Sequence, residues 1–384
     1  MLLGLILLFS LAAAAADWLH FRRARRARLR RLSLAWAAAT DALPLAVVGM
    51  GLLCRDNPTP VVMASMWLFW VWMATVLPRL AFYAFNFFGL RRTGLAAAAA
   101  VFAALVIGVT AGRTSLRVSR TEVCSPALPA TFDGLRIVQL SDIHLGTIVS
   151  PGRELTRLAD RVNALRPDLV LFTGDLVNIR ASELDRTAVR LLRRIEAPVY
   201  SVTGNHDVGK YIKDSLRHPA AESLCEVIAR QRAMGWRVLD DETVYLRRGG
   251  DSIALTGLSF DPALSEQRHD RHLPATGLRR AFAGVPQGLY SIVLAHVPQL
   301  WEQITAAGYG DLTLSGHVHA MQCKIRFGGR GWSPAALLYT HWSGRYDDSA
   351  GRTLYVNDGT GCVGYPMRLG ARPEITLITL KRCE

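Results

Sequence analysis

The chain has 384 residues, enough for one large domain and an accessory region, and half of the residues are hydrophobic. The hydrophobic excess lies before residue 113, where 11 arginines accompany only three acidic residues, so more than half of the net charge of +14 belongs to this part. Apolar runs combined with arginine are typical of membrane topology, which argues against nucleic-acid binding as the reason for the positive charge.

Four apolar runs predict membrane spans within residues 1–112. They are Met1–Ala16, Leu32–Leu53, Val61–Leu77 and Gly94–Gly112. Crossing the hydrocarbon core takes about 20 apolar residues, which the first run supplies only if Trp18 and Leu19 are included. The first run could instead be a cleaved signal peptide, but it lacks a positively charged start, and we favour an uncleaved anchor.

The loops between these runs predict their orientation. Seven arginines lie within Arg22–Arg31, and the loop before the fourth run carries three more. Short basic loops stay in the cytoplasm, whereas Cys54–Pro60, with one arginine and one aspartate, can lie outside. We therefore expect four spans, with the N-terminus and the large C-terminal part both outside. Asp41 falls within the second span, where an acid either has a function or pairs with a polar neighbour.

After residue 112 the pattern changes to short strands that alternate with helices. Residues 113–130 have the mixed polar composition of a linker. Within residues 131–384, segments such as Pro151–Leu165 have apolar residues at helical spacing, between short apolar runs that indicate buried strands. This alternation predicts an α/β sandwich with two sheets, preceded by a four-helix transmembrane region at residues 1–112.

Five predicted strands each end in side chains that bind metals. Asp142 and His144 follow the first strand, and residues i and i+2 of an extended segment point the same way, toward the edge where α/β sheets place their ligands. Glycines adjoin three of the five groups and allow close approach to an ion. Each group alone could be a turn, a cap or a core histidine, but five in succession favour one common site. The later groups are Asp175, Asn205 with His206, His296, and His317 with His319.

The ordered set Asp-x-His, Gly-Asp, Gly-Asn-His-Asp, His and Gly-His-x-His resembles the calcineurin-like metallophosphoesterase superfamily, from residue 135 to the C-terminus. The membrane-anchored layout is similar to a bacterial branch with cell-wall-associated and lipid-directed phosphoesterases. The resemblance implies two divalent metal ions, and mixed ligation of this kind suits Mn, Fe or Zn. The first ion would be held by Asp142, His144, Asp175 and His319, and the second by Asp175, Asn205, His296 and His317.

The resemblance also implies a mechanism. Two cations about 3.5–4 Å apart clamp the attacking and leaving oxygens of an in-line displacement, and a water that bridges them loses its proton near neutral pH. His206 would be the general acid, and Asp207 would orient it and raise its pKa. Many relatives carry an acid three residues after the bridging aspartate, where this chain has Asn178. We expect no metal loss from this difference, because Asn178 is outside the ligand set.

The remaining histidines and the cysteines match no motif. We interpret His218, His269 and His272 as surface residues, whereas His341 lies in a segment that could reach the site. The six cysteines form no Cys-x-x-Cys pair, so a thiolate zinc site is not expected. An oxidising compartment would permit disulfides, but their connectivity cannot be read from the sequence.

The sequence therefore predicts a membrane-anchored, dinuclear-metal phosphoesterase on the extracytoplasmic side of the cell membrane. It would hydrolyse phosphomonoesters or phosphodiesters, drawn from lipids, nucleotide sugars or the cell wall. Expected partners are this substrate and the lipid bilayer, with no nucleic acid, and the oligomeric state stays open. The alternative is a membrane channel, transporter or sensor whose outer metal-binding domain serves as a binding module. The chemistry would also permit a nuclease, but no aromatic–basic platform is in view.

Overall fold

The computed structural model describes residues 2–22, 27–261, 277–327 and 330–383. The chain divides into two compact units: a helical unit, Met1–Ala111 with Gly364–Leu369, and an α/β unit, Gly112–Val363 with Gly370–Glu384. The α/β unit thus begins well before residue 131, and the predicted linker at 113–130 is part of it.

The helical unit contains apolar helices whose lengths decide how many membrane spans it offers. Within the part of the chain that the structure describes, three stretches are long and apolar enough to cross a membrane, namely Arg30–Leu53, Thr59–Asn86 and Arg91–Gly112. The first apolar helix is shorter over Ile6–Phe21, so three candidate spans replace the predicted four. The helices are α1 (Leu2–Phe21), α2 (Ala27–Asp41), α3 (Leu43–Leu53), α4 (Thr59–Asn86) and α5 (Arg91–Ile107), which a π-helical turn continues over Gly108–Gly112.

A buried cluster of charged side chains links α1, α2 and α4. Arg79 makes ion pairs of 2.5 Å with both Asp17 and Asp41, and Tyr83 donates a hydrogen bond to Asp17. Charges in an apolar region are retained when they are paired, because an isolated buried ion costs several kcal/mol. Of the two interpretations of Asp41, the structure supports pairing with a polar neighbour.

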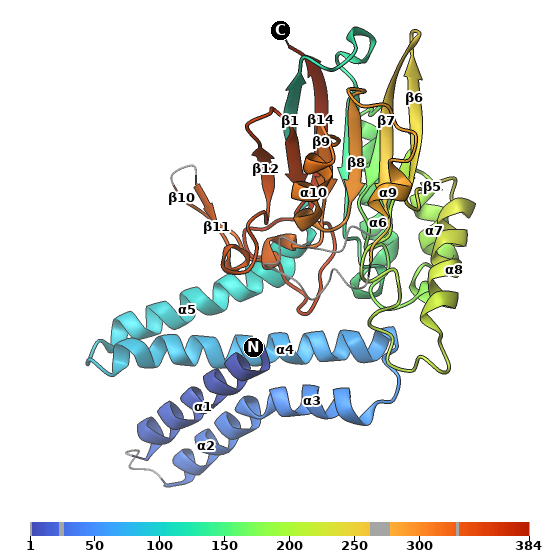
Figure 1. Ribbon diagram of the computed structural model, residues 1–384. Helices are drawn as coiled ribbons and strands as arrows, with labels where there is room; N and C mark the ends of the chain where they lie inside the picture. The colour runs from blue at the N-terminus through green and yellow to red at the C-terminus, as the bar shows by residue number, and fades with distance from the viewer. Residues whose placement is uncertain (1, 23–26, 262–276, 328–329, 384) are drawn as a thin grey trace. The chain divides into compact units, whose positions relative to one another are not determined.

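Two six-stranded sheets form the α/β unit, as predicted (Figure 1). Strands β2 to β5 are parallel neighbours in the first sheet, and β7, β8, β9 and β13 are parallel neighbours in the second. The first sheet has the order β1 (Arg117–Ser125), β14 (Glu374–Arg382), β2 (Arg136–Leu140), β3 (Leu169–Phe172), β4 (Val199–Ser201) and β5 (Arg237–Val238). The second has the order β12 (Gly344–Asp347), β13 (Thr353–Val356), β9 (Leu312–Ser315), β8 (Ser291–Ala295), β7 (Asp251–Leu258) and β6 (Glu242–Arg248). A separate hairpin joins β10 (Ile325–Phe327) to β11 (Arg330–Trp332).

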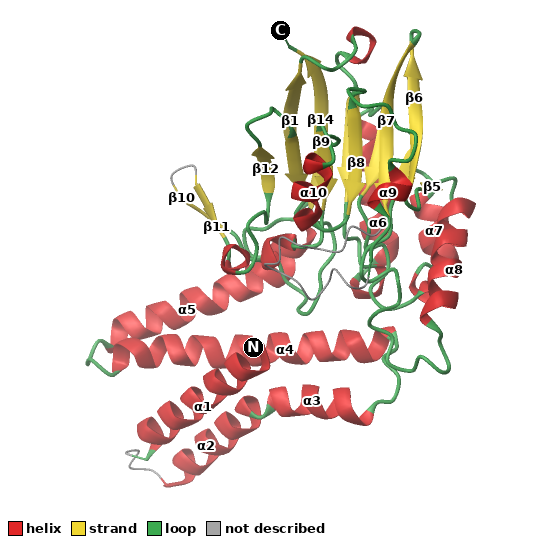
Figure 2. Cartoon of the chain, in the orientation of Figure 1, coloured by secondary structure: helices red, strands yellow, loops and turns green. Residues whose placement is uncertain are grey.

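The main core lies between the two sheets, where aliphatic side chains such as Ile137, Leu171, Leu255 and Leu314 are fully buried. Helices cover the outer faces, since each presents an apolar stripe to a sheet (Figure 2). The first sheet is covered by α6 (Pro151–Ala164), α7 (Arg186–Leu192) and α8 (Ala220–Ala233), and the second by α9 (Leu278–Ala281) and α10 (Trp301–Ala306).

Strand β1 occupies half of the segment predicted to be a linker. It pairs in parallel with β14 over its whole length, and a disulfide joins Cys124 to Cys383 with a Cα–Cα distance of 5.7 Å. Its sequence looks polar because it is the edge strand of the sheet and most of its side chains are at least partly exposed. The linker prediction is therefore wrong for Arg117–Ser125.

Candidate metal centre

The predicted metal ligands all follow the carboxyl ends of parallel strands. In the first sheet β2, β3 and β4 are neighbours, and in the second β8 and β9 are neighbours. Parallel neighbours deliver their following loops to the same edge of a sheet, which is why residues far apart in sequence meet there. The side chains brought together are Asp142, His144, Asp175, Asn205, His296, His317 and His319.

The backbone at these ligands is unusual. Five of them have positive φ angles between 47° and 71°, in the left-handed region that non-glycine residues seldom adopt. Close approach also depends on glycine, because a Cβ atom on Gly174 would lie 2.7 Å from the backbone nitrogen of Gly204, and one on Gly316 would overlap Ser141 and Asp142. The strained positions are Asp142, His144, Asp175, His317 and His319.

One group of ligands forms around His319. Its Nε2 atom lies 3.1 Å from Oδ1 of Asp142 and 3.1 Å from Nε2 of His144. Nε2 of His144 is also 3.8 Å from Oδ2 of Asp175. Burial opposes the charge on Asp142, but positive charge on His319 and a hydrogen bond from it hold the pKa of Asp142 below its ordinary value. The carboxylate is thus ready to bind a cation.

A second group forms around Asp175 and Asn205. Oδ2 of Asp175 is 3.2 Å from Nε2 of His296, and Oδ1 of Asn205 is 3.0 Å from the same nitrogen. Oδ1 of Asn205 is also 2.8 Å from Nδ1 of His317. Asp175 therefore faces both groups, which is the arrangement that a carboxylate shared by two metal ions requires.

The environment of His296 tests whether these residues fit a cation. Its Nδ1 atom donates to the carbonyl oxygen of Thr173 at 2.7 Å, so a neutral ring would direct the lone pair of Nε2 at the oxygens of Asp175 and Asn205. Only a proton or a metal ion between these atoms makes the contacts favourable. Accordingly, although burial opposes the charged ring, the carboxylate of Asp175 raises the pKa of His296 to about 9. The donor set fits a divalent cation at this position.

His206 lies at the partly exposed edge of the cluster. Its Nδ1 atom donates to the carbonyl oxygen of Asn178 at 2.6 Å, and its ring stacks on Tyr211 with centroids 4.3 Å apart. The ligand atoms of His206, His144 and Asp175 lie within 4.8 Å of one another. Burial lowers the pKa of His206, against the attraction of Asp175, so the predicted increase of its pKa is wrong.

The hydrogen bonds of Asp207 go to backbone groups rather than to His206. Its carboxylate accepts four backbone N–H groups at 2.8–3.1 Å, and it makes no hydrogen bond to His206 among the described residues. The backbone of Asn178, rather than Asp207, fixes the imidazole. Asp207 instead holds the loop of the shared aspartate, because its four partners are Gly204, Asp175, Leu176 and Val177.

Sequence reasoning missed a second carboxylate that braces the same loop. Glu183 accepts hydrogen bonds from the backbone N–H groups of Gly146, Asn178 and Ile179. Tyr211, whose hydroxyl accepts from the amide of Asn205 at 2.9 Å, was also missed. No motif marked either residue: Glu183 acts on backbone N–H groups, which leave no pattern in a sequence, and Tyr211 is not part of the Gly-Asn-His-Asp motif that it contacts.

Among the described residues, His218 and His341 belong to none of the groups that could hold a metal ion. His341 packs edge-on against Trp301 and Tyr346, so it does not reach the ligands. His218 is partly buried. His269 and His272 lie outside the described residues.

The fold and the site together define a class: a two-sheet α/β domain with His and Asp clusters, at the carboxyl ends of its strands, that are consistent with a binuclear metal site. The family model of calcineurin-like phosphoesterases matches residues 135–321. The uncharacterized metallophosphoesterase YkuE of Bacillus subtilis is 31% identical over 265 residues, which cover 67% of this chain and 82% of that protein. The chain belongs to the calcineurin-like metallophosphoesterase family.

Two further relatives differ in what their names describe. A transmembrane protein with metallophosphoesterase domain from Danio rerio is 32% identical over 72% of this chain, and this chain covers only 60% of its length. The UDP-2,3-diacylglucosamine pyrophosphatase LpxG of Chlamydia trachomatis is 24% identical over 68% of this chain and 88% of its own length.

Proposed function

We propose that this protein is a membrane-anchored phosphoesterase that hydrolyses a phosphate ester or diphosphate with two divalent metal ions. The observation that carries the proposal is the position of Asp175 between two groups of buried donors. Two ions held there would polarise the phosphoryl group and supply an activated water. Asp142, His144, Asp175 and His319 would hold one ion, and Asp175, Asn205, His296 and His317 the other.

His206 would act on the leaving group. Hydrogen bonding of Nδ1 to the carbonyl of Asn178 fixes the ring and leaves Nε2 to deliver a proton to the leaving oxygen. Its position at the partly exposed edge supports this role, because a substrate approaches from solvent whereas Asp142, His144 and Asp175 are almost completely buried. Asp207 would act as a positioning residue for Asp175 rather than as a partner of His206.

The disulfide supports the placement of the α/β unit outside the cytoplasm. Disulfides such as Cys124–Cys383 persist in oxidising compartments and are rare in the cytosol. The arginine-rich loop at Arg22–Arg31 agrees with this orientation, because short basic loops stay in the cytoplasm. Three candidate spans follow the loop before the α/β unit begins, and three crossings would put the loop and the α/β unit on opposite sides of the membrane.

The substrate class follows from the membrane placement and from the relatives. A relative named as a pyrophosphatase of a lipid-linked nucleotide sugar supports diphosphates that carry an apolar group, alongside simple phosphoesters. The partly exposed ring of His206 leaves room for a substrate that extends away from the metal centre.

The test is hydrolysis by the full chain in detergent, loaded with Mn²⁺, on p-nitrophenyl phosphate, bis-p-nitrophenyl phosphate and a nucleotide-sugar diphosphate. Wild type and Asp160→Asn, an exposed acid paired with Arg194 on the surface, should hydrolyse at least one class at equal rates. Asp175→Asn should lower the rate by a factor of at least 10³ and reduce the bound metal. Equal rates for wild type and Asp175→Asn on every substrate would contradict the proposal.

A further inference from the structure

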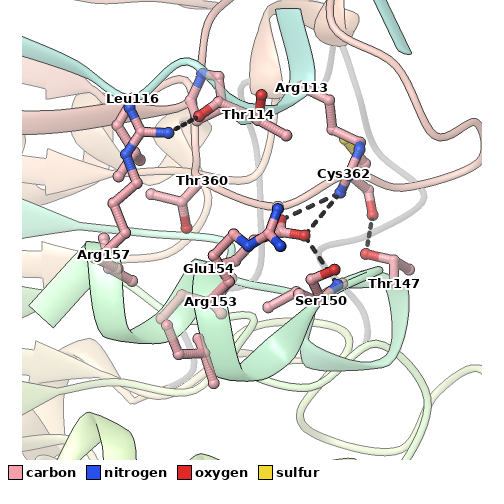
Figure 3. A pocket seen from close by; sticks show the side chains of 16 residues that line it. Arg113, Thr114, Leu116, Thr147, Ser150, Arg153, Glu154, Arg157, Thr360 and Cys362 are labelled. Carbon is pink, nitrogen blue, oxygen red and sulfur yellow. Dashed lines mark hydrogen bonds and ion pairs between the residues drawn. The ribbon is translucent and has the colours of Figure 1, made fainter. Parts of the chain in front are cut away.

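A cavity separate from the metal-binding side chains lies where the α/β unit begins (Figure 3). Its volume is about 220 Å³. Its walls are formed by the start of the unit at Arg113–Leu116, the loop around Ile143 and Thr147, the first turns of α6, and Thr360–Cys362 together with Pro373. None of the predicted metal ligands lines it, so the proposed reaction gives it no role.

The charged groups of the cavity leave an excess of positive charge. Glu154 is the one acid in the lining, and Nη1 of Arg113 lies 3.1 and 3.2 Å from its two oxygens. Nη1 of Arg157 donates to the carbonyl oxygen of Thr114 at 2.9 Å, which leaves its charge uncompensated. Arg153 is exposed and makes no ion pair within the described residues. Two guanidinium groups on adjacent turns of α6 are therefore available to an anion.

The rest of the lining is mixed, with the hydroxyl groups of Thr147, Ser150 and Thr360 beside an apolar part. Leu116, Ile148, Leu155 and Leu158 line the cavity beside the arginines. A free inorganic anion gains nothing from such a surface, whereas a phosphate attached to a hydrocarbon group gains from both parts of the lining. The lining thus favours an amphipathic anion over a small ion.

Chain connectivity places this cavity near a bilayer. Arg113 directly follows Gly112, the last residue of the candidate span Arg91–Gly112. Because each residue extends the chain by at most about 3.6 Å, the rim formed by Arg113 and Thr114 stays within a few ångströms of the end of that helix. At a membrane surface that carries anionic lipids, each positively charged side chain next to a span gains about 1 kcal/mol.

We propose that this cavity binds the headgroup of an anionic phospholipid, with Arg153 and Arg157 contacting the phosphate. The bound lipid would touch the segment that carries two metal ligands, because Ile143 lies between Asp142 and His144. Thr147, also in the lining, donates from Oγ1 to the carbonyl oxygen of His144 at 2.9 Å. The lipid would thus stabilise this loop as well as tether the unit. This inference rests on the membrane placement in the proposed function but not on turnover.

The test uses the detergent-solubilised full chain and water-soluble dihexanoyl phosphatidylglycerol, with dihexanoyl phosphatidylcholine and glycerol 3-phosphate as comparison probes. Hydrogen–deuterium exchange of Thr147–Leu158 reports binding without any substrate. Phosphatidylglycerol should slow exchange in this segment, and the other two probes should not at the same concentration. Equal protection by phosphatidylcholine would overturn the role of charge, and equal protection by glycerol 3-phosphate would identify a site for free phosphate esters instead.

Two double variants distinguish lipid binding in the cavity from a general effect of positive charge. Arg153→Gln with Arg157→Gln should weaken the binding of phosphatidylglycerol about thirty-fold, from the loss of two contacts. Arg247→Gln with Arg248→Gln removes the same charge from exposed positions on β6 and should leave the affinity unchanged. Equal affinities of the two double variants would overturn the proposal. Because exchange is measured without substrate, a chain that fails to hydrolyse any phosphate ester still gives a decisive result here.

Discussion

Replacement of Asp207 by asparagine tests whether this residue holds the metal centre or assists His206. An asparagine of the same shape keeps one oxygen but places an NH₂ group against two of the four backbone N–H donors. Two buried N–H groups would lose their acceptor, at about 1–3 kcal/mol each. Part of this cost is offset, because burial and the negative charge of Asp175 raise the pKa of Asp207 to about 7 and the substitution relieves both effects. We expect a net loss of about 2–4 kcal/mol in stability.

The assay is the thermal midpoint of the full chain in detergent, with a chelator and with Mn²⁺, together with bound metal and the pH dependence of turnover. For a unit of this size, 2–4 kcal/mol corresponds to a decrease of roughly 4–16 °C. Metal affinity should fall as well, since the loop of Asp175 loses its brace, while the pH at which activity declines stays unchanged. Asp160→Asn is the charge-matched surface control. A thermal midpoint equal to that of wild type, combined with a shifted pH profile, would refute this reasoning and indicate that Asp207 assists His206.

Three further predictions concern other parts of the chain. In the metal-free protein the raised pKa of His296, about 9 against 6.5, means that the stability from its ion pair is complete below pH 6.5 and is lost as the pH rises through 9. Metal loading at pH 7 should therefore release about one proton from this ring, which calorimetry in buffers of different ionisation enthalpy would detect. If His296→Asn released the same number of protons as wild type, the assignment to His296 would be contradicted. Cys124→Ser, Cys383→Ser and the double variant should each lose the same stability, about 3–5 kcal/mol in thermal or denaturant unfolding, because each breaks one disulfide; additive losses would exclude that bond. Arg79→Gln should destabilise the helical unit by about 3–5 kcal/mol by leaving two buried carboxylates unpaired, and Asp41→Asn in the same chain should restore part of the midpoint measured in detergent; no restoration would mean that the pairing contributes little.

The sequence predicted the two-sheet architecture and the meeting of the seven ligands because both depend on local signals. Each ligand follows a short apolar strand, and a glycine marks three of the turns. Once parallel strands are assigned, their carboxyl ends share an edge of the sheet, which places Asp142 and Asp175 together. His296 follows a strand of the second sheet, so its place beside them also depends on how the two sheets pack.

Strand β1 was not predicted from the sequence because the evidence for it is non-local. Its partner β14 lies some 250 residues further along, and an exposed edge strand has no continuous apolar pattern. The missing information is thus the tertiary context of the segment. The described residues offer three candidate spans where the sequence predicted four.

Proximity in sequence suggested a side-chain partner for Asp207, whereas its hydrogen-bond partners in the structure are backbone N–H groups. Such groups are present at every residue and leave no pattern in a sequence, and the same holds for Glu183. Ligands in left-handed conformations need exactly this kind of support, because about 1–3 kcal/mol of strain at each must be offset by the surrounding structure. Two buried or partly buried carboxylates that together accept seven backbone hydrogen bonds provide it. The geometry of the metal centre is therefore set by residues that bind no metal, and variants of Asp207 and Glu183 should lower metal affinity without removing a ligand.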